Sequence, residues 1–167
     1  AQAMPANFAG RGEITRGRDA TVTAIRTAQP VVALTFDDGP HPQHTPVLLD
    51  MLAALQVRAT FFMLGRNVAR YPALVARVAA EGHEIGNHSW SHPVLSNLSD
   101  AAAMSEIDRT TLAIQDGAGR PPVLMRPPYG AFTERQRLML HRARNMPTVL
   151  WSVDPEDWRR PGSAAVT

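Results

Sequence analysis

The residues best suited to chemistry are two adjacent carboxylates, Asp37 and Asp38, which follow the apolar run 31–34 and precede a Gly-Pro pair. A buried strand that ends this way delivers both acids to its C-terminal edge, where open α/β sheets and barrels build their sites. Two carboxylates this close are costly to ionise together unless a cation lies nearby. The pair therefore indicates a metal, a basic residue or both, and the alternative is an ordinary solvated Asp-Gly-Pro turn.

His88 and His92 form a second group, because a spacing of four places both imidazoles on the same side of one helical turn. With one carboxylate they would make a site that leaves positions open for water or substrate, which is the catalytic pattern. Nitrogen and oxygen ligands without sulfur suit zinc, and also cobalt, nickel or iron. An isolated pair of this spacing is more often loop chemistry, and rival ligands are present at His41, His44 and His83.

Alternating strands and helices must position these groups. Apolar runs predict strands at 31–36, 59–64, 84–87, 123–125 and 148–153. Amphipathic patterns and capping residues predict helices at about 46–56, 72–81, 100–117 and 133–143. This alternation is typical of a parallel α/β sheet or barrel. Because parallel strands point the same way, the segments 37–38, 88–93, 126–130 and 154–158 are expected to meet on one face.

Composition favours a single globular domain of 167 residues, with 44% hydrophobic and 19% charged residues. Residues 1–29 are polar and predict an N-terminal arm with a short strand at 20–25, and residues 30–167 form the predicted domain. No apolar run approaches the roughly 18 residues of a membrane span. The scattered arginines and net charge of +2 argue against nucleic-acid binding. The chain contains no cysteine, which excludes thiolate ligands.

Two further side chains belong to the predicted face. Arg126 is followed by two prolines that stiffen the strand end, and its guanidinium can pair with a carboxylate and keep it ionised. Its alternative is a solvated arginine in a proline turn. Trp158, beside Asp157, suits either an ordinary buried aromatic or a platform for a sugar ring.

With these motifs the sequence resembles the polysaccharide deacetylase family, the NodB-homology domain of carbohydrate esterase family 4. Four motifs occur in the family's order, TFDDGP at 35–40, HSWSH at 88–92, RPPYG at 126–130 and DPEDW at 154–158. The resemblance implies a distorted, incomplete (β/α) barrel. It also implies hydrolysis of N-acetyl groups on an N-acetylglucosamine-containing polysaccharide, namely peptidoglycan, chitin or poly-N-acetylglucosamine. O-acetyl xylan esterase and cyclic amidohydrolase are alternatives on the same fold.

The resemblance also implies roles for individual residues. Asp38, His88 and His92 would hold a divalent metal, usually zinc, with cobalt or nickel as alternatives. Asp37 would be the general base, and Arg126 would orient it and keep it charged.

The backbone N–H of Tyr129 would stabilise the oxyanion, Tyr129 and Trp158 would contact the substrate, and Asp157 resembles a residue that tunes a later histidine. That histidine, the family's general acid in a Leu-x-His motif, has no counterpart, since no histidine follows His141. We therefore expect missing C-terminal strands, an open sheet edge and, as one alternative, a second chain that completes the barrel. We expect metal binding with poor deacetylation, and a carbohydrate-binding pseudoenzyme is the alternative. The substrate implies a secreted, periplasmic or cell-envelope location, although no signal peptide is visible.

Overall fold

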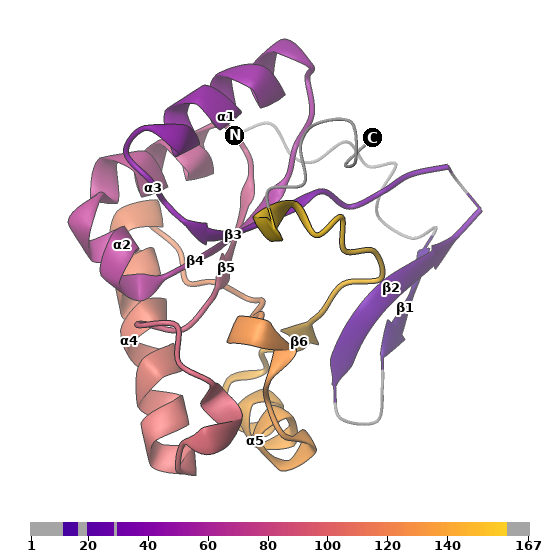
Figure 1. Ribbon diagram of the computed structural model, residues 1–167, viewed down its shortest axis with the longest axis vertical. Coiled ribbons are helices and arrows are strands. Elements are labelled where there is room, and N and C mark those ends of the chain that lie inside the picture. Colours follow the sequence, from indigo (N-terminus) through magenta and orange to yellow (C-terminus); the bar gives the residue numbers. More distant parts are fainter. Residues whose placement is uncertain (1–11, 17–19, 29, 160–167) are drawn as a thin grey trace.

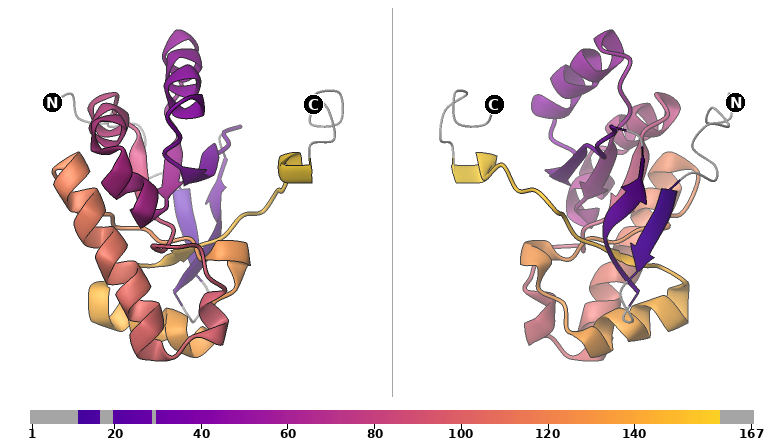
Figure 2. Two further views of the ribbon diagram at one scale, coloured as in Figure 1. Left: turned by 60° about the vertical axis from the view of Figure 1, so that its left-hand side comes forward. Right: turned by 90° about the vertical axis from the view of Figure 1, so that its right-hand side faces the viewer.

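The computed structural model describes residues 12–16, 20–28 and 30–159. Parallel strands form its centre (Figure 1), and three of them pair in the order β3-β4-β5, with bounds Thr35–Gly39, Thr60–Met63 and Glu84–Asn87. A second sheet has the order β1-β2-β6, with bounds Gly12–Arg16, Thr21–Thr27 and Thr148–Val149. Met125 joins the two sheets, because it bridges Asn87 and Thr148 in parallel. After β6 the chain leaves the sheet, and the 3₁₀ turn η3 (Asp157–Arg159) lies apart from it (Figure 2).

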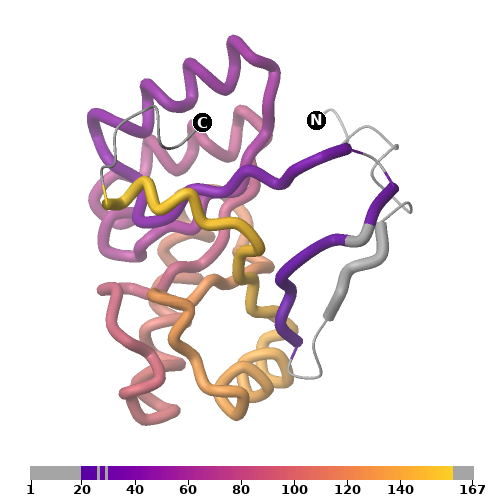
Figure 3. Tube along the Cα trace, turned by 45° about the vertical axis from the view of Figure 1, so that its right-hand side comes forward, coloured from indigo at the N-terminus to yellow at the C-terminus, as the bar shows by residue number. Residues whose placement is uncertain are grey.

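Helices and strands alternate along the chain as predicted. Four helices lie on the side opposite the β1–β2 hairpin (Figures 1 and 3), namely α1 (His44–Ala54), α2 (Gly65–Arg70), α3 (Pro72–Ala80) and α4 (Asp100–Ala118). The connection from α4 to β6 contains the 3₁₀ turn η2 (Pro128–Gly130) and the helix α5 (Glu134–Arg144), and η1 (Leu95–Asn97) precedes α4. The described strands do not close into a ring, so the predicted α/β class with an incomplete barrel is confirmed.

Capping residues account for the ends of the longer helices. The Ser99 hydroxyl accepts the Ala102 N–H at the start of α4, and Gly119 ends that helix with a left-handed φ of 73°. Thr133 forms a capping box at the start of α5, and Asn145 ends it in the left-handed conformation. These boundaries agree with the prediction. The short α2 was not predicted, since six residues carry too little periodicity.

Two apolar clusters hold the layers together. One joins α1, α3 and α4 to the strands β4 and β5, and contains Leu49, Leu52, Phe61, Met63, Val75, Val78, Ile85 and Ile114. The other lies where α4 and α5 meet the 3₁₀ turns, and contains Leu95, Ala103, Ile107, Met125, Phe132, Leu140 and Met146. The strand ends that carry the polar motifs are therefore anchored on packed elements.

Three predicted strands are shorter than expected. The run 31–34 is not a strand, and Val32 is 90% exposed. Among the described residues, its hydrogen bond to β4 is the one from the Thr60 N–H to the Leu34 carbonyl. The predicted strand 123–125 is reduced to the bridge at Met125, after two prolines that cannot donate to a ladder. The predicted strand 148–153 ends at Val149, because the Val149 and Leu150 carbonyls accept from the Arg126 guanidinium.

The N-terminal region is only partly described. The predicted strand at 20–25 is present as β2, and it pairs with β6 of the main domain. The antiparallel partner β1 was not predicted. Residues 1–11 of the predicted arm and residues 160–167 at the other end lie outside the described residues, so the division at 29/30 stays a prediction. Among the described helices, none combines the length and the apolar character needed to cross a membrane.

Candidate metal centre

Three predicted ligands come together at the C-terminal ends of β3 and β5. The Asp38 Oδ1 atom lies 3.4 Å from His88 Nε2 and 3.2 Å from His92 Nε2. One ligand atom from each residue lies within 4.8 Å of the other two, so a single ion could contact all three. The structure therefore assembles the carboxylate and the two imidazoles whose spacing predicted a metal site.

A bulge in β3 explains how adjacent aspartates reach the same edge. Asp37 pairs with Phe62 and Gly39 pairs with Met63, which leaves Asp38 without a partner in the ladder. Asp38 has a left-handed φ of 70°, and its carbonyl accepts from the Asn67 side-chain amide at 3.0 Å. The bulge turns the Asp38 side chain away from the regular alternation of a strand, so both carboxylates face the histidines.

His88 presents a lone pair to Asp38. Its Nδ1 atom lies 2.6 Å from the Arg126 carbonyl oxygen, which can only accept, so Nδ1 carries the proton. In the neutral ring, Nε2 is then unprotonated and faces the Asp38 carboxylate. Two electron-rich atoms in contact require a proton or a cation between them. A ligand histidine that donates its other N–H to a carbonyl is typical of metal sites, so the donor set fits a divalent cation.

The His92 and Tyr129 rings pack edge to face beside this cluster. The Tyr129 hydroxyl lies 3.2 Å from His92 Nδ1, and the two rings are T-shaped with centroids 4.7 Å apart. Burial lowers the pKa of His92, which favours the neutral imidazole that can bind a metal. When the His88 ring is protonated, its hydrogen bond lowers the pKa of Asp38; burial opposes this, and positive charge on His88, His92 and Arg66 lowers the pKa further.

Asp37 is held by Arg126. The guanidinium Nη1 donates to Asp37 Oδ1 and to Thr35 Oγ1, both at 2.8 Å. The other Asp37 oxygen, Oδ2, lies 3.9 Å from His88 Nε2, on the side of the cluster. Arg126 is only 4% exposed and its Cζ atom lies 4.2 Å from the Phe62 ring centroid. One carboxylate oxygen is thus fixed by a buried cation, and the other faces His88.

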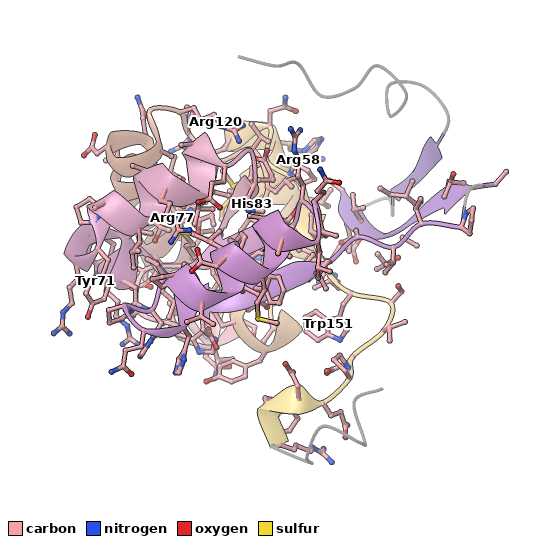
Figure 4. All side chains as sticks on the ribbon, turned by 90° about the horizontal axis from the view of Figure 1, so that it is seen from above. Arg58, Tyr71, Arg77, His83, Arg120 and Trp151 are labelled. Carbon is pink, nitrogen blue, oxygen red and sulfur yellow. The ribbon has the colours of Figure 1, made fainter. Side chains whose placement is uncertain are left out.

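Tyr129 and the other predicted site residues, Asp157 and Trp158, are exposed. Tyr129 is 68% exposed and has a left-handed φ of 59° within η2. Asp157 and Trp158 are exposed on η3, the turn that lies apart from the sheet (Figure 2), and the Arg159 guanidinium covers the Trp158 ring at 4.7 Å. The segment leading there begins at Trp151, which stands away from the helical layer in Figure 4. The structure does not bring Asp157 or Trp158 to the cluster, and their roles stay predictions.

The rival histidines lie outside the cluster. His41 and His44 stack on each other with centroids 4.3 Å apart, and His41 Nδ1 accepts backbone N–H groups of its own loop. His83 is buried at the start of β5, where its Nδ1 accepts the Ala59 N–H at 3.1 Å. Sequence reasoning missed Asn67 and Glu106, which support the ligand segments from α2 and α4, because neither belongs to a recognisable motif.

Comparison with known proteins identifies the family. The family model described as polysaccharide deacetylase matches residues 24–146. The chain belongs to the polysaccharide deacetylase family. The peptidoglycan-N-acetylmuramic acid deacetylase PdaC of Bacillus subtilis is 47% identical over 131 residues, which cover 78% of this chain and 27% of that protein. A chitooligosaccharide deacetylase of Bradyrhizobium is 45% identical over 132 residues, which cover 78% of this chain and 60% of that protein.

Solved structures of the family share the fold. The Bc1960 peptidoglycan N-acetylglucosamine deacetylase superposes with a TM-score of 0.85 and 40% identity, over 89% of this chain and 69% of that one. A family 4 carbohydrate esterase from Streptomyces lividans has a TM-score of 0.76 and 38% identity, over 81% and 69% of the two chains. This polysaccharide deacetylase chain thus spans between about a quarter and three fifths of the two curated relatives named above.

Proposed function

We propose that this chain is a metal-dependent hydrolase that removes N-acetyl groups from an N-acetylglucosamine-containing polysaccharide, namely peptidoglycan, chitin or poly-N-acetylglucosamine. The observation that carries the proposal is the meeting of Asp38, His88 and His92 beside an Asp37 carboxylate held by Arg126. Relatives named as peptidoglycan and chitooligosaccharide deacetylases support this substrate class.

The proposed metal is zinc, with cobalt or nickel as alternatives, held by Asp38, His88 and His92. Their nitrogen and oxygen donors match the preference of these ions. A bound divalent ion would supply Lewis-acid activation of a water molecule and of the acetyl carbonyl. The chain's own contribution is to keep the His92 imidazole neutral and the Asp38 carboxylate ionised, as the lowered pKa values of these two groups allow.

Asp37 is the proposed general base. Its Oδ2 atom is on the side of the histidines, while Oδ1 is occupied by the Arg126 guanidinium. It would take a proton from water as the water oxygen attacks the acetyl carbonyl carbon. Arg126 would fix the direction of the carboxylate by donating to its Oδ1 atom. Because the carboxylate is oriented before substrate binds, the attacking water meets a base that needs no rearrangement.

Tyr129 and the η3 residues have proposed roles toward the substrate. The Tyr129 backbone N–H would donate to the oxygen of the tetrahedral intermediate, and its exposed ring would contact the sugar. Trp158 would stack on a sugar ring, and Asp157 keeps the tuning role that the family resemblance implies. Release of the amine requires a proton, and none of the described residues is assigned to donate it. We therefore propose slow turnover by the 167-residue chain.

The setting of this activity is also proposed. An acetylated cell-wall polysaccharide as substrate favours a secreted, periplasmic or envelope location. A second chain that completes the barrel remains an alternative, since in the described residues β3 pairs with β4 alone.

A carbohydrate-binding pseudoenzyme is the second candidate function. A structure named as a carbohydrate esterase family 4 pseudoenzyme from Bacillus anthracis superposes with a TM-score of 0.81 at 26% identity. This likeness supports the pseudoenzyme as a second candidate function.

Acetate release from a panel of substrates tests the proposal. The purified chain with Zn²⁺ is given chitooligosaccharides, peptidoglycan and acetylated xylan, beside an Asp37→Asn variant. We expect slow acetate release from the N-acetylated substrates and none from the variant. Release from xylan alone would support the O-acetyl esterase. Glycan binding without acetate release, even with excess metal, would support the pseudoenzyme.

A further inference from the structure

The loop from His88 to His92 carries two of the three proposed ligands, so its shape decides whether they converge. Two of its residues have left-handed backbone, Ser89 with φ 65° and His92 with φ 67°. L-residues adopt this conformation at a cost, and it persists where surrounding contacts hold it. The loop therefore depends on partners outside itself.

The ends of the loop are held by local contacts. The His88 N–H donates to the Met63 carbonyl at 3.0 Å, as part of the strand pairing. The Ser89 N–H donates to the Asn87 side chain at 2.9 Å, and the His92 N–H donates to the Ser89 hydroxyl at 3.2 Å. These three donors are satisfied by residues that are themselves in or beside β4 and β5.

The middle of the loop is held by one carboxylate. Glu106 Oε2 accepts the backbone N–H groups of Trp90 at 3.0 Å and of Ser91 at 2.8 Å. The Ser91 hydroxyl lies 3.1 Å from Oε1 and 3.2 Å from Oε2 of the same residue. Hydrogen bonds to a charged carboxylate are shorter and stronger than those between neutral groups. Both backbone donors at the centre of the loop thus end on a single side chain from α4.

Two residues that follow Glu106 in the same helix also contact the loop or the residue before it. Asn87 directly precedes the loop, and its side-chain amide donates to the Ile107 carbonyl at 2.8 Å. The Arg109 guanidinium lies over the Trp90 ring at 4.1 Å from its centroid. Ile107 is fully buried in the second apolar cluster, so this turn of α4 is a fixed support. The hydrogen bonds from Trp90 and Ser91 to Glu106 attach the loop to this support.

We infer that Glu106 is a positioning residue of the metal centre, which holds the loop so that His88 and His92 reach a common ion. The inference rests on the proposed metal site. A merely structural role would act through packing between α4 and the loop. Ser91 is exposed and Trp90 is only partly buried, so water can replace the carboxylate when it is removed. The fold then survives, and the loss falls on the alignment of the two imidazoles.

Metal affinity measured on matched variants tests this inference. Glu106→Ala removes the acceptor, whereas Glu106→Gln keeps an amide oxygen for both N–H groups and an amide N–H for the Ser91 hydroxyl. Asp108→Ala removes an acid from the same helix, where it pairs with Arg144 on the surface. Each chain is titrated with Zn²⁺ against a chelator, and the visible spectrum of its Co²⁺ form is recorded. The melting temperature without metal controls for stability.

We expect Glu106→Ala to bind Zn²⁺ roughly tenfold or more weakly and to give an altered Co²⁺ spectrum, as is usual when a group that orients a ligand is lost. Glu106→Gln and Asp108→Ala should bind as the wild type does. Wild-type affinity and spectrum in Glu106→Ala would overturn the inference, and so would equal weakening in Glu106→Gln, which would point to charge alone. If Glu106→Ala does not fold, Glu106→Asp replaces it, because its shorter side chain moves the carboxylate away from the loop. Wild-type zinc affinity in Glu106→Asp would then overturn the inference. A wild-type chain that binds neither ion would overturn the proposed metal centre itself.

Discussion

The Arg126 guanidinium lies 2.8 Å from Asp37 Oδ1, although the two residues are 89 positions apart in the chain. The same guanidinium donates to Thr35 Oγ1 and to the carbonyls of Val149 and Leu150. Its side chain is 5% exposed, whereas that of Asp37 is 32% exposed. The proposed general base on β3 is therefore tied to two other segments of the chain, those of Arg126 and of Val149 and Leu150, through one buried cation.

Replacing Arg126 should cost both stability and activity. Arg126→Ala leaves Asp37, Thr35 and two carbonyls without their donor, and we expect the free energy of unfolding to fall by about 3 kcal/mol. Arg126→Lys should recover only part of this, because an ammonium cannot reproduce the planar fork. Urea unfolding followed by circular dichroism measures the change. Full stability in Arg126→Ala would show that the ion pair does not hold these segments together.

Gly86 should not tolerate a side chain. A Cβ atom there would lie 2.4 Å from Phe62 Cδ1 and 2.5 Å from Cε1. Phe62 is 1% exposed and the Arg126 guanidinium packs on its ring, so the ring cannot move away without disturbing its neighbours. We expect Gly86→Ala to lower the free energy of unfolding by about 1–3 kcal/mol. In denaturant unfolding this loss should exceed that of Gly119→Ala, where no atom lies within 4 Å of the new Cβ and only the left-handed φ is strained. A smaller loss at Gly86 would contradict the packing argument.

His83 should make stability depend on pH. Figure 4 shows it on the side of the molecule that carries Arg58 and Arg120, and its Nδ1 accepts the Ala59 N–H. Burial lowers the pKa of His83 and Arg58 lowers it further, while Glu81 at 4.0 Å opposes them. The unfolded chain, with a pKa of about 6.5, then binds the proton better. Stability should fall as pH drops below about 6.5, by at most about 1.4 kcal/mol per pH unit, and level off below the folded pKa.

His83→Asn should remove this dependence, because the Asn oxygen can accept the Ala59 N–H without titrating. Unfolding measured between neutral and mildly acidic pH would reveal it as a flatter profile. His44→Asn, which changes an exposed ring, is the control and should keep the wild-type slope. An unchanged slope in His83→Asn would show that other groups carry the acid sensitivity.

Much of the site could be predicted because its residues occur in short motifs at strand ends. The spacing of His88 and His92 and the adjacency of Asp37 and Asp38 are local features of the sequence, and together they indicate a metal site. The bulge at Asp38 could not be predicted, since it depends on pairing with β4. Glu106 was also missed, because its partners lie in another segment and no local pattern links them.

The strands after residue 120 were the least predictable part of the fold. The apolar run 148–153 suggested a full strand, yet the Arg126 side chain takes the carbonyls that a neighbouring strand would use. The run 31–34 is apolar but exposed. Its hydropathy predicted a buried strand, because an apolar pattern shows what a segment could bury and not whether a partner covers it. Capped helices such as α4 and α5 were predictable because their end signals are local.

Zinc binding by Asp38→Asn and Asp37→Asn, measured side by side by calorimetry, tests the central claim that the two adjacent acids have different roles. Asp38 Oδ1 is the oxygen in contact with both imidazoles, whereas Asp37 Oδ1 is committed to Arg126. We predict that Asp38→Asn weakens zinc binding by at least about a hundredfold, beyond the usual loss for a supporting residue. Asp37→Asn should bind zinc within a few-fold of the wild type while releasing no acetate. Equal loss of zinc in both variants, or loss in Asp37→Asn alone, would contradict the assignment of ligand and base.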